Sequence, residues 1–448
     1  MNNIPIQDVL AAEPLKAADL VDSRIDEGVF RVDRRIYTDE AIFEQEIKKL
    51  FEQGWVFLCH ESQVEQTGDY YATFIGRQPV VVIRDDQGHL NAFINACAHR
   101  GAVLTERRQG NARTLRCRFH GWCYNTQGKC TRIKNEKTGW PEGVDKADKS
   151  LTPIGRIESY RGFVFGSLVA DVPDLDSYLG EAKLIMDLLV DQSPEGIEVI
   201  GGHSDYIIRG NWKMQAENGV DGYHVSTVHR VFADTVIQRE TRLGNEGVAK
   251  TEAGRIAGMV QTGCYDLGGG HMMVWANRAT PEVAPLYESK ERLLKTFPEA
   301  KVKWMLERGR NLCVFPNVLF MDQPSTQIRI FRPLSVNRTL VTVYCIAPRG
   351  ESERAREARI RKFEDFYMVT GMATPDDLTA LEDCQIGAWG QTAQWTDCER
   401  GMSSMQQGPD AFAKELGMNP ATSNSDWDFE TLYYGYYHKW VEMMSQED

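Results

Sequence analysis

The spacing of apolar residues changes along the chain and divides it into three segments. Residues 38–54 carry one apolar stripe with the period of a helix, and Thr38 can cap the start of that helix. From about 69 to 170, short β-rich runs alternate with turns that contain Asp, Asn and Gly. This pattern predicts a small antiparallel β domain. The stripe consists of Ile42, Phe43, Ile47, Leu50 and Phe51, and the clearest β-rich runs are 79–83 and 90–94.

The rest of the chain, from about 175 to 448, mixes helical and strand-like stretches. Irregular alternation of long helices with paired strands is typical of an α+β domain. We therefore expect an N-terminal helical segment at 1–54, a β domain at 55–172 and a third domain at 173–448. The predicted helices of the third domain are 178–192, 287–309 and 352–370, and its predicted strands are 327–331 and 340–346.

Charge and hydropathy narrow the class of protein. The chain has 51 basic and 64 acidic residues and a formal net charge of −13, which repels nucleic-acid phosphates and anionic lipid. No stretch approaches the roughly 20 apolar residues of a membrane span. Residues 1–20 lack the basic start and apolar core of a secretory signal. We expect a cytoplasmic protein that binds neither nucleic acid nor membrane.

Ten cysteines are too few for a disulfide scaffold in a chain of 448 residues. Four of them fall between 97 and 130, where such clustering favours a metal site or catalysis. The others are scattered, and we expect them to be small buried apolar residues. They are Cys59, Cys264, Cys313, Cys345, Cys384 and Cys398.

Two Cys-His pairs stand on turn-rich connections between predicted strands. Cys97 and His99 form the first pair, and Cys117 and His120 form the second. A structural zinc site would more often pair cysteine with cysteine and histidine with histidine, and a chance grouping of buried residues is a further possibility. The interleaved order suits a two-iron, two-sulfur cluster in which one iron takes both thiolates and the other takes both imidazoles.

A cluster of that kind would accept electrons. Two neutral imidazoles in place of two thiolates reduce the negative charge of the centre and raise its reduction potential. The centre can then take electrons from a ferredoxin-like donor. Gly101 and Gly121 follow the two histidines, where the missing side chains would let the backbone approach the cluster closely and donate N–H bonds to its sulfur.

A second group of candidate ligands lies in the segment 211–229. Its two histidines, His224 and His229, are five residues apart, a step that turns an ideal helix by about 140°. Both imidazoles can reach one metal only if the helix is interrupted or bulged between them, and Gly219 and Gly222 favour such an irregularity. Two imidazoles and one carboxylate form the facial triad of non-haem iron(II) oxygenases, which leaves positions open for dioxygen.

The first group closely resembles the Rieske motif, and the second resembles the mononuclear-iron motif of Rieske ring-hydroxylating oxygenases. The resemblance implies a [2Fe-2S] cluster held by Cys97, His99, Cys117 and His120. It calls for no ligand at Cys123 or Cys130, which we assign to packing.

The same resemblance implies that His224, His229 and Asp377 bind a mononuclear Fe(II). It makes Asp221 the bridging carboxylate between an iron-ligating histidine and a cluster histidine of the adjacent subunit. For Asp377 an ordinary alternative exists, because Thr374 as N-cap, Pro375 at the first helical position and acids in the first turn make a plain helix start. Asp376 is the neighbouring candidate, whereas in the family the second aspartate of this pair is the ligand.

The resemblance extends to the large subunits of benzoate, toluate, 2-halobenzoate and anthranilate dioxygenases. It implies an α+β protein with an antiparallel β Rieske domain and a catalytic domain built on a helix-covered antiparallel sheet. It also implies a small β subunit, an α3β3 ring, and a ferredoxin-NADH reductase component, since the chain has no Gly-rich dinucleotide fingerprint. The segments that carry it are 28–31, 75–79, 157–163, 311–317 and 372–377.

The implied reaction adds both atoms of dioxygen to adjacent ring carbons of a benzoate-like aromatic carboxylate. A salicylate hydroxylase or an aniline dioxygenase would use the same metal centres. Three further kinds of protein compete with this interpretation: a monooxygenase or demethylase, an electron carrier with the cluster alone, and a zinc hydrolase built on the two histidines. No residue stands out as the partner of the substrate carboxylate. Candidates for the pocket wall are Trp275, Asn277, Arg278, Met321 and the strand 327–331.

Overall fold

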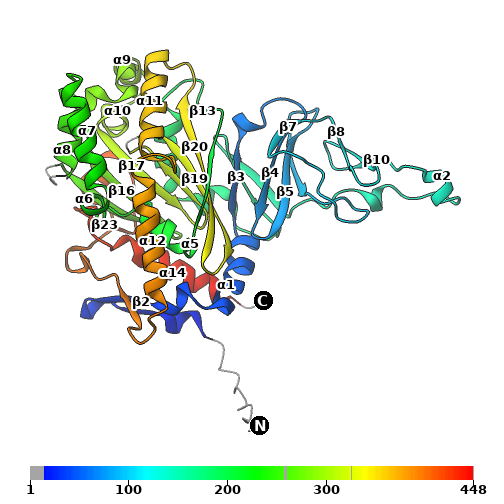
Figure 1. The fold of residues 1–448 in the computed structure, drawn as a ribbon, viewed down its shortest axis with the longest axis horizontal. Coiled ribbons are helices and arrows are strands. Elements are labelled where there is room, and N and C mark those ends of the chain that lie inside the picture. The colour runs from blue at the N-terminus through cyan, green and yellow to red at the C-terminus, as the bar shows by residue number, and fades with distance from the viewer. Residues whose placement is uncertain (1–14, 257–259, 324, 447–448) are drawn as a thin grey trace, which may run out of the picture.

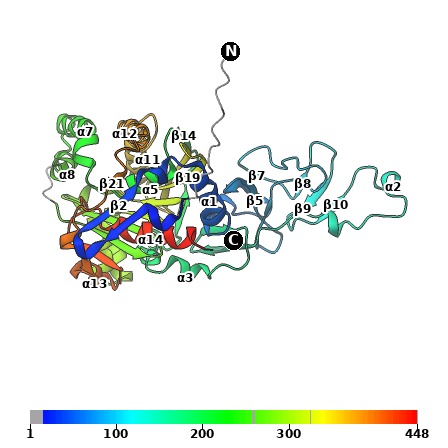
Figure 2. The ribbon, with the colours of Figure 1, turned by 90° about the horizontal axis from the view of Figure 1, so that it is seen from below.

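A computed structural model describes residues 15–256, 260–323 and 325–446. Figures 1 and 2 show a broad body of sheet and helices that carries a smaller β domain on one side. The expectation about a secretory signal concerns residues 1–20, most of which lie outside the described residues. In the part of the chain that is described, no helix is both long and apolar enough to cross a membrane.

The N-terminal segment contains strands as well as the predicted helix. Strands β1 (Val21–Arg24) and β2 (Val29–Asp33) form an antiparallel hairpin. Strand β21 (Trp395–Asp397), from far along the chain, pairs with β2. The N-terminal segment is therefore built into the body of the molecule.

The predicted helix at 38–54 begins at Glu40, two residues after the start of the predicted range. It consists of α1 (Glu40–Glu46) followed by a π-helical turn, Ile47–Glu52, and its whole apolar stripe is buried. The expected cap at Thr38 is wrong. Asp39 caps α1, because its side chain accepts a hydrogen bond from the amide of Ile42 at 2.9 Å.

Three small antiparallel sheets make up the β domain. Their strand orders are β6-β5-β4-β7, β10-β9-β8 and β11-β12-β3, and the predicted runs 79–83 and 90–94 are confirmed as β5 and β6. A short helix, α2 (Glu136–Gly139), lies at the far tip in Figure 1. The strands are β3 Val56–His60, β4 Asp69–Ile75, β5 Gln78–Arg84, β6 Leu90–Ile94, β7 Gln109–Asn111, β8 Thr114–Arg116, β9 Cys123–Asn125, β10 Cys130–Arg132, β11 Arg156–Tyr160 and β12 Phe163–Ser167.

A ten-stranded antiparallel sheet organises the body. Its order is β13-β20-β19-β18-β17-β16-β15-β23-β22, and β14 also pairs with β20. The predicted strands 327–331 and 340–346 are confirmed within β19 and β20. The strands are β13 Ile197–Val199, β14 Ser204–Ile208, β15 Thr262–Gly268, β16 His271–Asn277, β17 Arg308–Val314, β18 Val318–Met321, β19 Gln327–Ser335, β20 Arg338–Pro348, β22 Gln406–Gln407 and β23 Thr422–Asn424.

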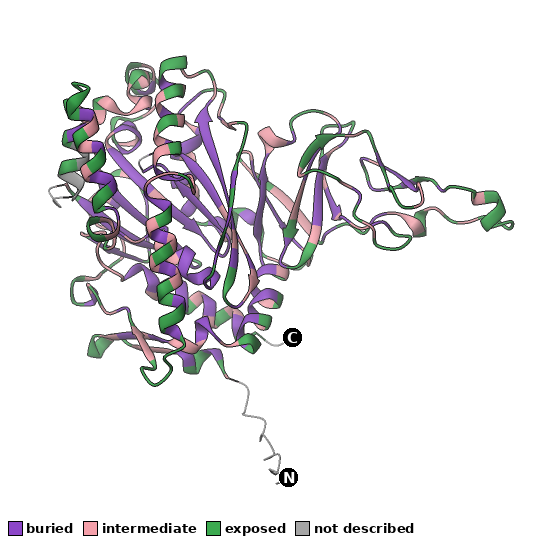
Figure 3. Cartoon of the chain, in the orientation of Figure 1, coloured by how far each residue is buried: buried purple, intermediate pink, exposed green. Residues whose placement is uncertain are grey.

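Both faces of this sheet are buried, as the purple strands of Figure 3 show. On one face, Phe331 of β19 stacks on Trp212 of α5 (Trp212–Asn218) with ring centroids 6.4 Å apart. Ile328 points to the opposite face, because side chains alternate along a strand, and it lies in a second apolar cluster. Helices α11 and α12 pass in front of the sheet with their outer faces exposed (Figures 1 and 3). The molecule is therefore an α+β protein, as expected.

Two predicted helices are interrupted. The stretch 178–192 contains the end of α3 (Leu175–Leu179) and then α4 (Ala182–Val190), with Gly180 at φ +46° between them. The stretch 287–309 contains α9 (Lys290–Thr296) and α10 (Glu299–Glu307), separated at Pro298. The other helices are α6 Val225–Val228, α7 Arg230–Arg242, α8 Glu246–Ile256, α11 Glu353–Phe366, α12 Thr374–Ala388, α13 Ala411–Leu416 and α14 Leu432–Met444.

Candidate metal centres

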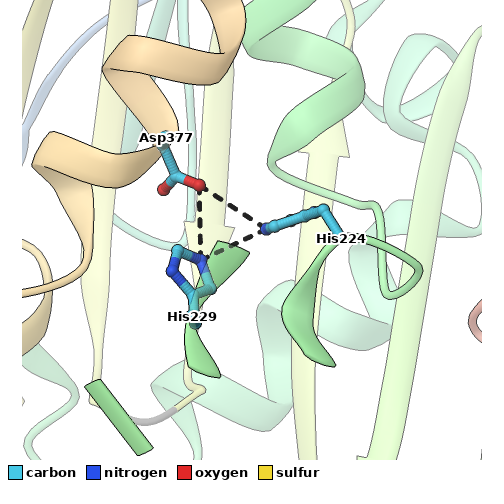
Figure 4. Close-up of side chains that lie close together, drawn as sticks. All are labelled: His224, His229 and Asp377. Atoms are coloured by element: carbon cyan, nitrogen blue, oxygen red, sulfur yellow. Dashed lines mark hydrogen bonds and ion pairs between the residues drawn. The ribbon is translucent and has the colours of Figure 1, made fainter. Parts of the chain in front are cut away.

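Two histidines and one aspartate converge between α6 and α12. Figure 4 shows His224 and His229 pointing toward one another and toward Asp377. The two Nε2 atoms are 3.2 Å apart, and Asp377 Oδ1 lies 3.3 Å from His229 Nε2 and 3.6 Å from His224 Nε2. Two imidazoles and a carboxylate so arranged form the donor set of a facial iron(II) site. The structure therefore places three of the predicted ligands where one cation can meet all of them.

A break in the helix brings the two histidines together. Helix α6 ends at Val228, His229 has φ −93° and ψ 17°, and α7 begins at Arg230. The helix is therefore interrupted at His229, as the five-residue spacing predicted. The glycines before it are required by close packing. A Cβ on Gly222 would lie 2.3 Å from the ring of Trp427, and one on Gly219 would lie 2.3 Å from the side chain of Leu319.

Asp377 reaches the histidines from the first turn of α12. The alternative in which Thr374 caps this helix is wrong. The Thr374 hydroxyl donates to backbone carbonyls of the preceding segment, and Ala373 takes the cap position without a side-chain bond. Asp377 is buried, and burial raises the pKa of its carboxyl group, while the charges of His224 and Arg329 oppose that rise. Asp376 is half-buried and does not join the group.

Asp221 lies directly behind His224. Its Oδ2 is 3.0 Å from His224 Nδ1, and its Oδ1 accepts a hydrogen bond from the amide of Tyr223 at 2.6 Å. A carboxylate on Nδ1 holds the imidazole in the tautomer whose Nε2 lone pair is free for a metal. Asp221 therefore orients His224 toward His229 and Asp377.

A cavity of about 410 Å³ opens on the Asp221 side of this site, and its wall includes Asp221, His224 and Asp377. Two further carboxyl groups on the wall, Glu217 and Glu430, were not identified from the sequence. Burial raises the pKa of each to about 7. The hydroxyls of Tyr37 and Tyr437 donate to Glu217. Glu217 lies within the segment 211–229, but its burial depends on these distant tyrosines, which the local sequence does not reveal.

The two Cys-His pairs lie on matching loops of the β domain. Gly101 N–H donates to the Cys97 carbonyl at 2.8 Å, and Gly121 N–H donates to the Cys117 carbonyl at 2.9 Å. Both glycines have φ above +70°, a conformation that L side chains rarely adopt. The expectation that backbone N–H groups of these loops donate to cluster sulfur stays a prediction. The glycines close each loop onto its own cysteine carbonyl.

Sulfur and nitrogen donors separate into two pairs. Cys97 and Cys117 are buried. Burial raises the pKa of the Cys97 thiol. The adjacent Cys117 thiol raises this pKa further, whereas the Tyr124 hydroxyl lowers it. The imidazoles of His99 and His120 lie toward the surface, with their Nδ1 atoms 3.1 Å apart. A thiol pair beside an imidazole pair fits two irons better than one tetrahedral zinc.

Comparison with known proteins identifies the family. Residues 54–159 match the model of the Rieske [2Fe-2S] domain, and residues 194–446 match the catalytic domain of the ring hydroxylating alpha subunit. The chain is 44% identical to toluate 1,2-dioxygenase subunit alpha of Pseudomonas putida, with 95% of this chain and 94% of that protein covered. This chain belongs to the family of ring-hydroxylating alpha subunits.

Other members of the family agree in sequence and fold. The 2-halobenzoate 1,2-dioxygenase large subunit of Burkholderia cepacia is 43% identical over 93% of this chain and 90% of that protein. A solved structure of naphthalene 1,2-dioxygenase with indole bound in the active site superposes with a TM-score of 0.80 at 25% identity, covering 93% of this chain and 92% of that one. The two matched domains of this ring-hydroxylating alpha subunit imply a Rieske cluster and a mononuclear iron, and the donor sets described above fit both.

Several expectations about individual residues have mixed outcomes. Cys123 and Cys130 are buried, as expected of packing residues, but Cys384 is exposed, so its assignment as a buried apolar residue is wrong. Met321 and Arg329, within the predicted pocket-wall set, line a cavity with the two histidines. Trp275 is instead a core residue.

Proposed function

We propose that this ring-hydroxylating alpha subunit adds both atoms of dioxygen to adjacent ring carbons of an aromatic carboxylate. The observation that carries the proposal is the convergence of His224, His229 and Asp377 behind a cavity, in a chain that also contains a Rieske domain. Relatives named for toluate and 2-halobenzoate 1,2-dioxygenation, each more than 40% identical, support a benzoate-like substrate.

Each metal centre has its own ligands in this proposal. Cys97 and Cys117 hold one iron of the cluster, His99 and His120 hold the other, and His224, His229 and Asp377 hold the mononuclear iron. When bound, the cluster supplies electrons one at a time and the ferrous ion activates dioxygen beside the ring. The corresponding domains are the Rieske domain at 55–172 and the catalytic domain at 173–448, preceded by the segment 1–54.

Asp221 has two tasks in the proposed reaction. It keeps the Nε2 lone pair of His224 directed at the metal by accepting the Nδ1 proton. It also stands on the wall of the open cavity, where an imidazole of an adjacent subunit can reach its carboxylate.

The arrangement of one chain supports transfer between subunits. In Figures 1 and 2 the cluster loops, next to β8 and β9, lie in the projecting domain, whereas α6 and α12 lie well away in the body. Phe119 and Val103, beside the cluster histidines, are 59% and 54% exposed. Large exposed apolar side chains around a redox site favour a docking surface. We infer a ring of three chains in which each Rieske domain meets the next catalytic domain, together with a small β subunit as α3β3.

Electrons reach the cluster from NADH through a separate ferredoxin-NADH reductase component. The exposed imidazoles of His99 and His120 provide the point of entry, since the thiol ligands are buried.

The proposed reaction is tested with isotopically labelled dioxygen. The purified oxygenase, its reductase and NADH are incubated with benzoate under ¹⁸O₂, and the product is analysed by mass spectrometry. A cis-diol carrying two labelled oxygens is the expected result. A product with one labelled oxygen identifies a monooxygenase, and turnover of aniline or salicylate but not benzoate assigns the chain to that substrate class instead.

A further inference from the structure

One buried arginine near the metal ligands has no carboxylate of a described residue within ion-pair distance, although its charge acts through space on Asp377. Four arginines in the described part of the chain are less than 5% exposed. Arg308 pairs with Glu415 at 2.9 Å, Arg310 pairs with Asp322, and Arg359 pairs with Glu351 at 2.8 Å. Arg329 is 3% exposed but makes no ion pair or hydrogen bond with any described residue. A buried charge without an ion-pair partner is costly, and Asp377 is directed at the two histidines, so the retained arginine points to an anion that arrives with a ligand.

Arg329 stands on the wall of the cavity behind the metal ligands. The floor of that cavity comes from four neighbouring strands of the large sheet, through Val274, Asn311, Met321 and Arg329. Its roof comes from the segment that carries His224 and His229, together with Asp377. Arg329 and the three proposed metal ligands therefore line the same cavity.

The position of Arg329 follows from strand alternation. Arg329 shares a face of β19 with Phe331, which packs on Trp212 of α5, and it pairs in register with Leu319 and Val343. Tyr367 flanks the guanidinium, with the Arg329 Cζ 5.6 Å from the ring centroid. A planar cation held between an aromatic ring and the sheet is preorganised for a bidentate contact.

A second donor lines the same cavity. Among the described residues, no acceptor lies within hydrogen-bond distance of the buried Gln323 Nε2. An amide N–H and a guanidinium can both donate to a carboxylate, which accepts through two oxygens. The acceptor Asn311 Oδ1 on this wall also lacks a hydrogen-bond partner among the described residues. It can therefore accept a hydrogen bond from a donor group on an aromatic ligand.

We propose that Arg329 binds the carboxylate of the aromatic substrate and directs its ring toward the metal site, with Gln323 as a supporting donor. This inference rests on the proposed function and identifies the residue that selects acids over neutral aromatics. The charge of Arg329 is complementary to a carboxylate alone, because a neutral amide or a hydrocarbon leaves the guanidinium unpaired.

Binding requires the cavity to expand. The cavity measures about 40 Å³, room for a few water molecules. Phe366 lies on its wall and packs edge-on against Phe232 with centroids 4.8 Å apart, and Phe232 lines a separate cavity of about 610 Å³. Movement of Phe366 and of the flexible Met321 side chain would provide the space for an aromatic ring.

The test compares acid with amide. Calorimetry on the oxidised oxygenase complex, without reductant, gives a separate Kd value for each acid and for each amide. The acids are benzoate, 2-chlorobenzoate and anthranilate, and each is compared with its own amide. The native protein is expected to bind each acid at least 10-fold more tightly than its amide. Arg329→Gln is expected to weaken acid binding about 10- to 100-fold and to remove that preference, because one charge-assisted contact is lost. Arg329→Lys should retain a preference for the acid.

Arg332 supplies the matched control. It lies on the opposite face of the same strand, with its Cζ 3.2 Å from the ring centroid of Phe74, and its Nε also lacks a described partner. Arg332→Gln should leave the acid-to-amide ratio unchanged. An unchanged ratio in Arg329→Gln overturns the assignment while leaving the proposed function intact. A native protein that binds and oxidises only neutral aromatics refutes the proposed function itself.

A crystal structure of the native complex with benzoate decides the case if Arg329→Gln does not fold. A carboxylate oxygen within hydrogen-bond distance of the Arg329 guanidinium supports the inference. A carboxylate directed at another part of the wall overturns it.

Discussion

Asp221 Oδ2 lies 3.0 Å from Nδ1 of His224, whose other ring nitrogen faces His229 and Asp377. One carboxylate thus fixes the orientation of a proposed metal ligand while it lies on the wall of an open cavity. This relationship explains why a residue that need not touch the metal can control the centre.

Asp221→Asn should keep both metal centres and slow electron transfer to the mononuclear site. The amide retains an acceptor for His224 but loses the negative charge, and outer-shell changes of this kind typically cost roughly 10- to 100-fold. Stopped-flow oxidation of the reduced cluster in the presence of benzoate and dioxygen measures the rate. A single-turnover rate equal to that of the native protein would exclude a bridging role for Asp221.

Asp377→Ala should abolish product formation and deplete the mononuclear iron, because the site loses its one anionic ligand. The visible spectrum of the cluster should not change, since Asp377 lies in the body of the molecule. Asp376→Ala is the control and should retain iron and activity. Retention of full activity by Asp377→Ala would refute the ligand assignment.

Tyr124→Phe should lower the reduction potential of the cluster. The Tyr124 hydroxyl lies 3.1 Å from Cys97 Sγ, and a donor to cluster sulfur stabilises the more negative, reduced state. A loss on the order of 60 mV would correspond to a tenfold change in the one-electron equilibrium. Redox titration followed by electron paramagnetic resonance measures the potential. An unchanged potential with an intact cluster would show that this hydroxyl does not donate to the ligand.

Asp266→Asn should stabilise the protein at high pH but not at low pH. Burial raises the pKa of Asp266 from 3.8 to about 6 in the folded chain, so the unfolded chain loses this proton first as the pH rises. Stability therefore falls between about pH 4 and pH 6, by roughly 3 kcal/mol in full. Asparagine keeps an acceptor for the Gly268 amide and avoids this loss.

Thermal unfolding midpoints of the native protein and of Asp266→Asn, compared at pH 4.5 and pH 8, test this prediction. The difference should be larger at pH 8. A difference that does not depend on pH would mean that Asp266 titrates normally in the folded state.

Local sequence predicts the parts of this molecule that depend on local geometry. The five-residue spacing of His224 and His229 required a helix break, and the break occurs at His229. The interleaved order of Cys97, His99, Cys117 and His120 indicated two kinds of metal donor, and the structure separates thiols from imidazoles. The β-rich runs and the strands β19 and β20 follow from alternation of apolar residues.

Features that depend on contacts between distant segments could not be predicted. Thr38 was the cap expected from the sequence, and only the path of the chain selects Asp39. Asp377 was preferred over Asp376 through family resemblance, whereas the packing of α12 decides which one faces the histidines. In the sequence, Arg329 is one of several charged residues on a predicted strand. Only the folded structure shows that it is buried without an ion-pair partner among the described residues.

Metal and sulfide analysis of anaerobically purified protein tests the central claim most directly. A [2Fe-2S] cluster with one mononuclear site predicts three irons and two labile sulfides per chain, with a coloured Rieske spectrum. Protein that contains zinc alone, is colourless, and takes up no iron on anaerobic reconstitution would contradict it.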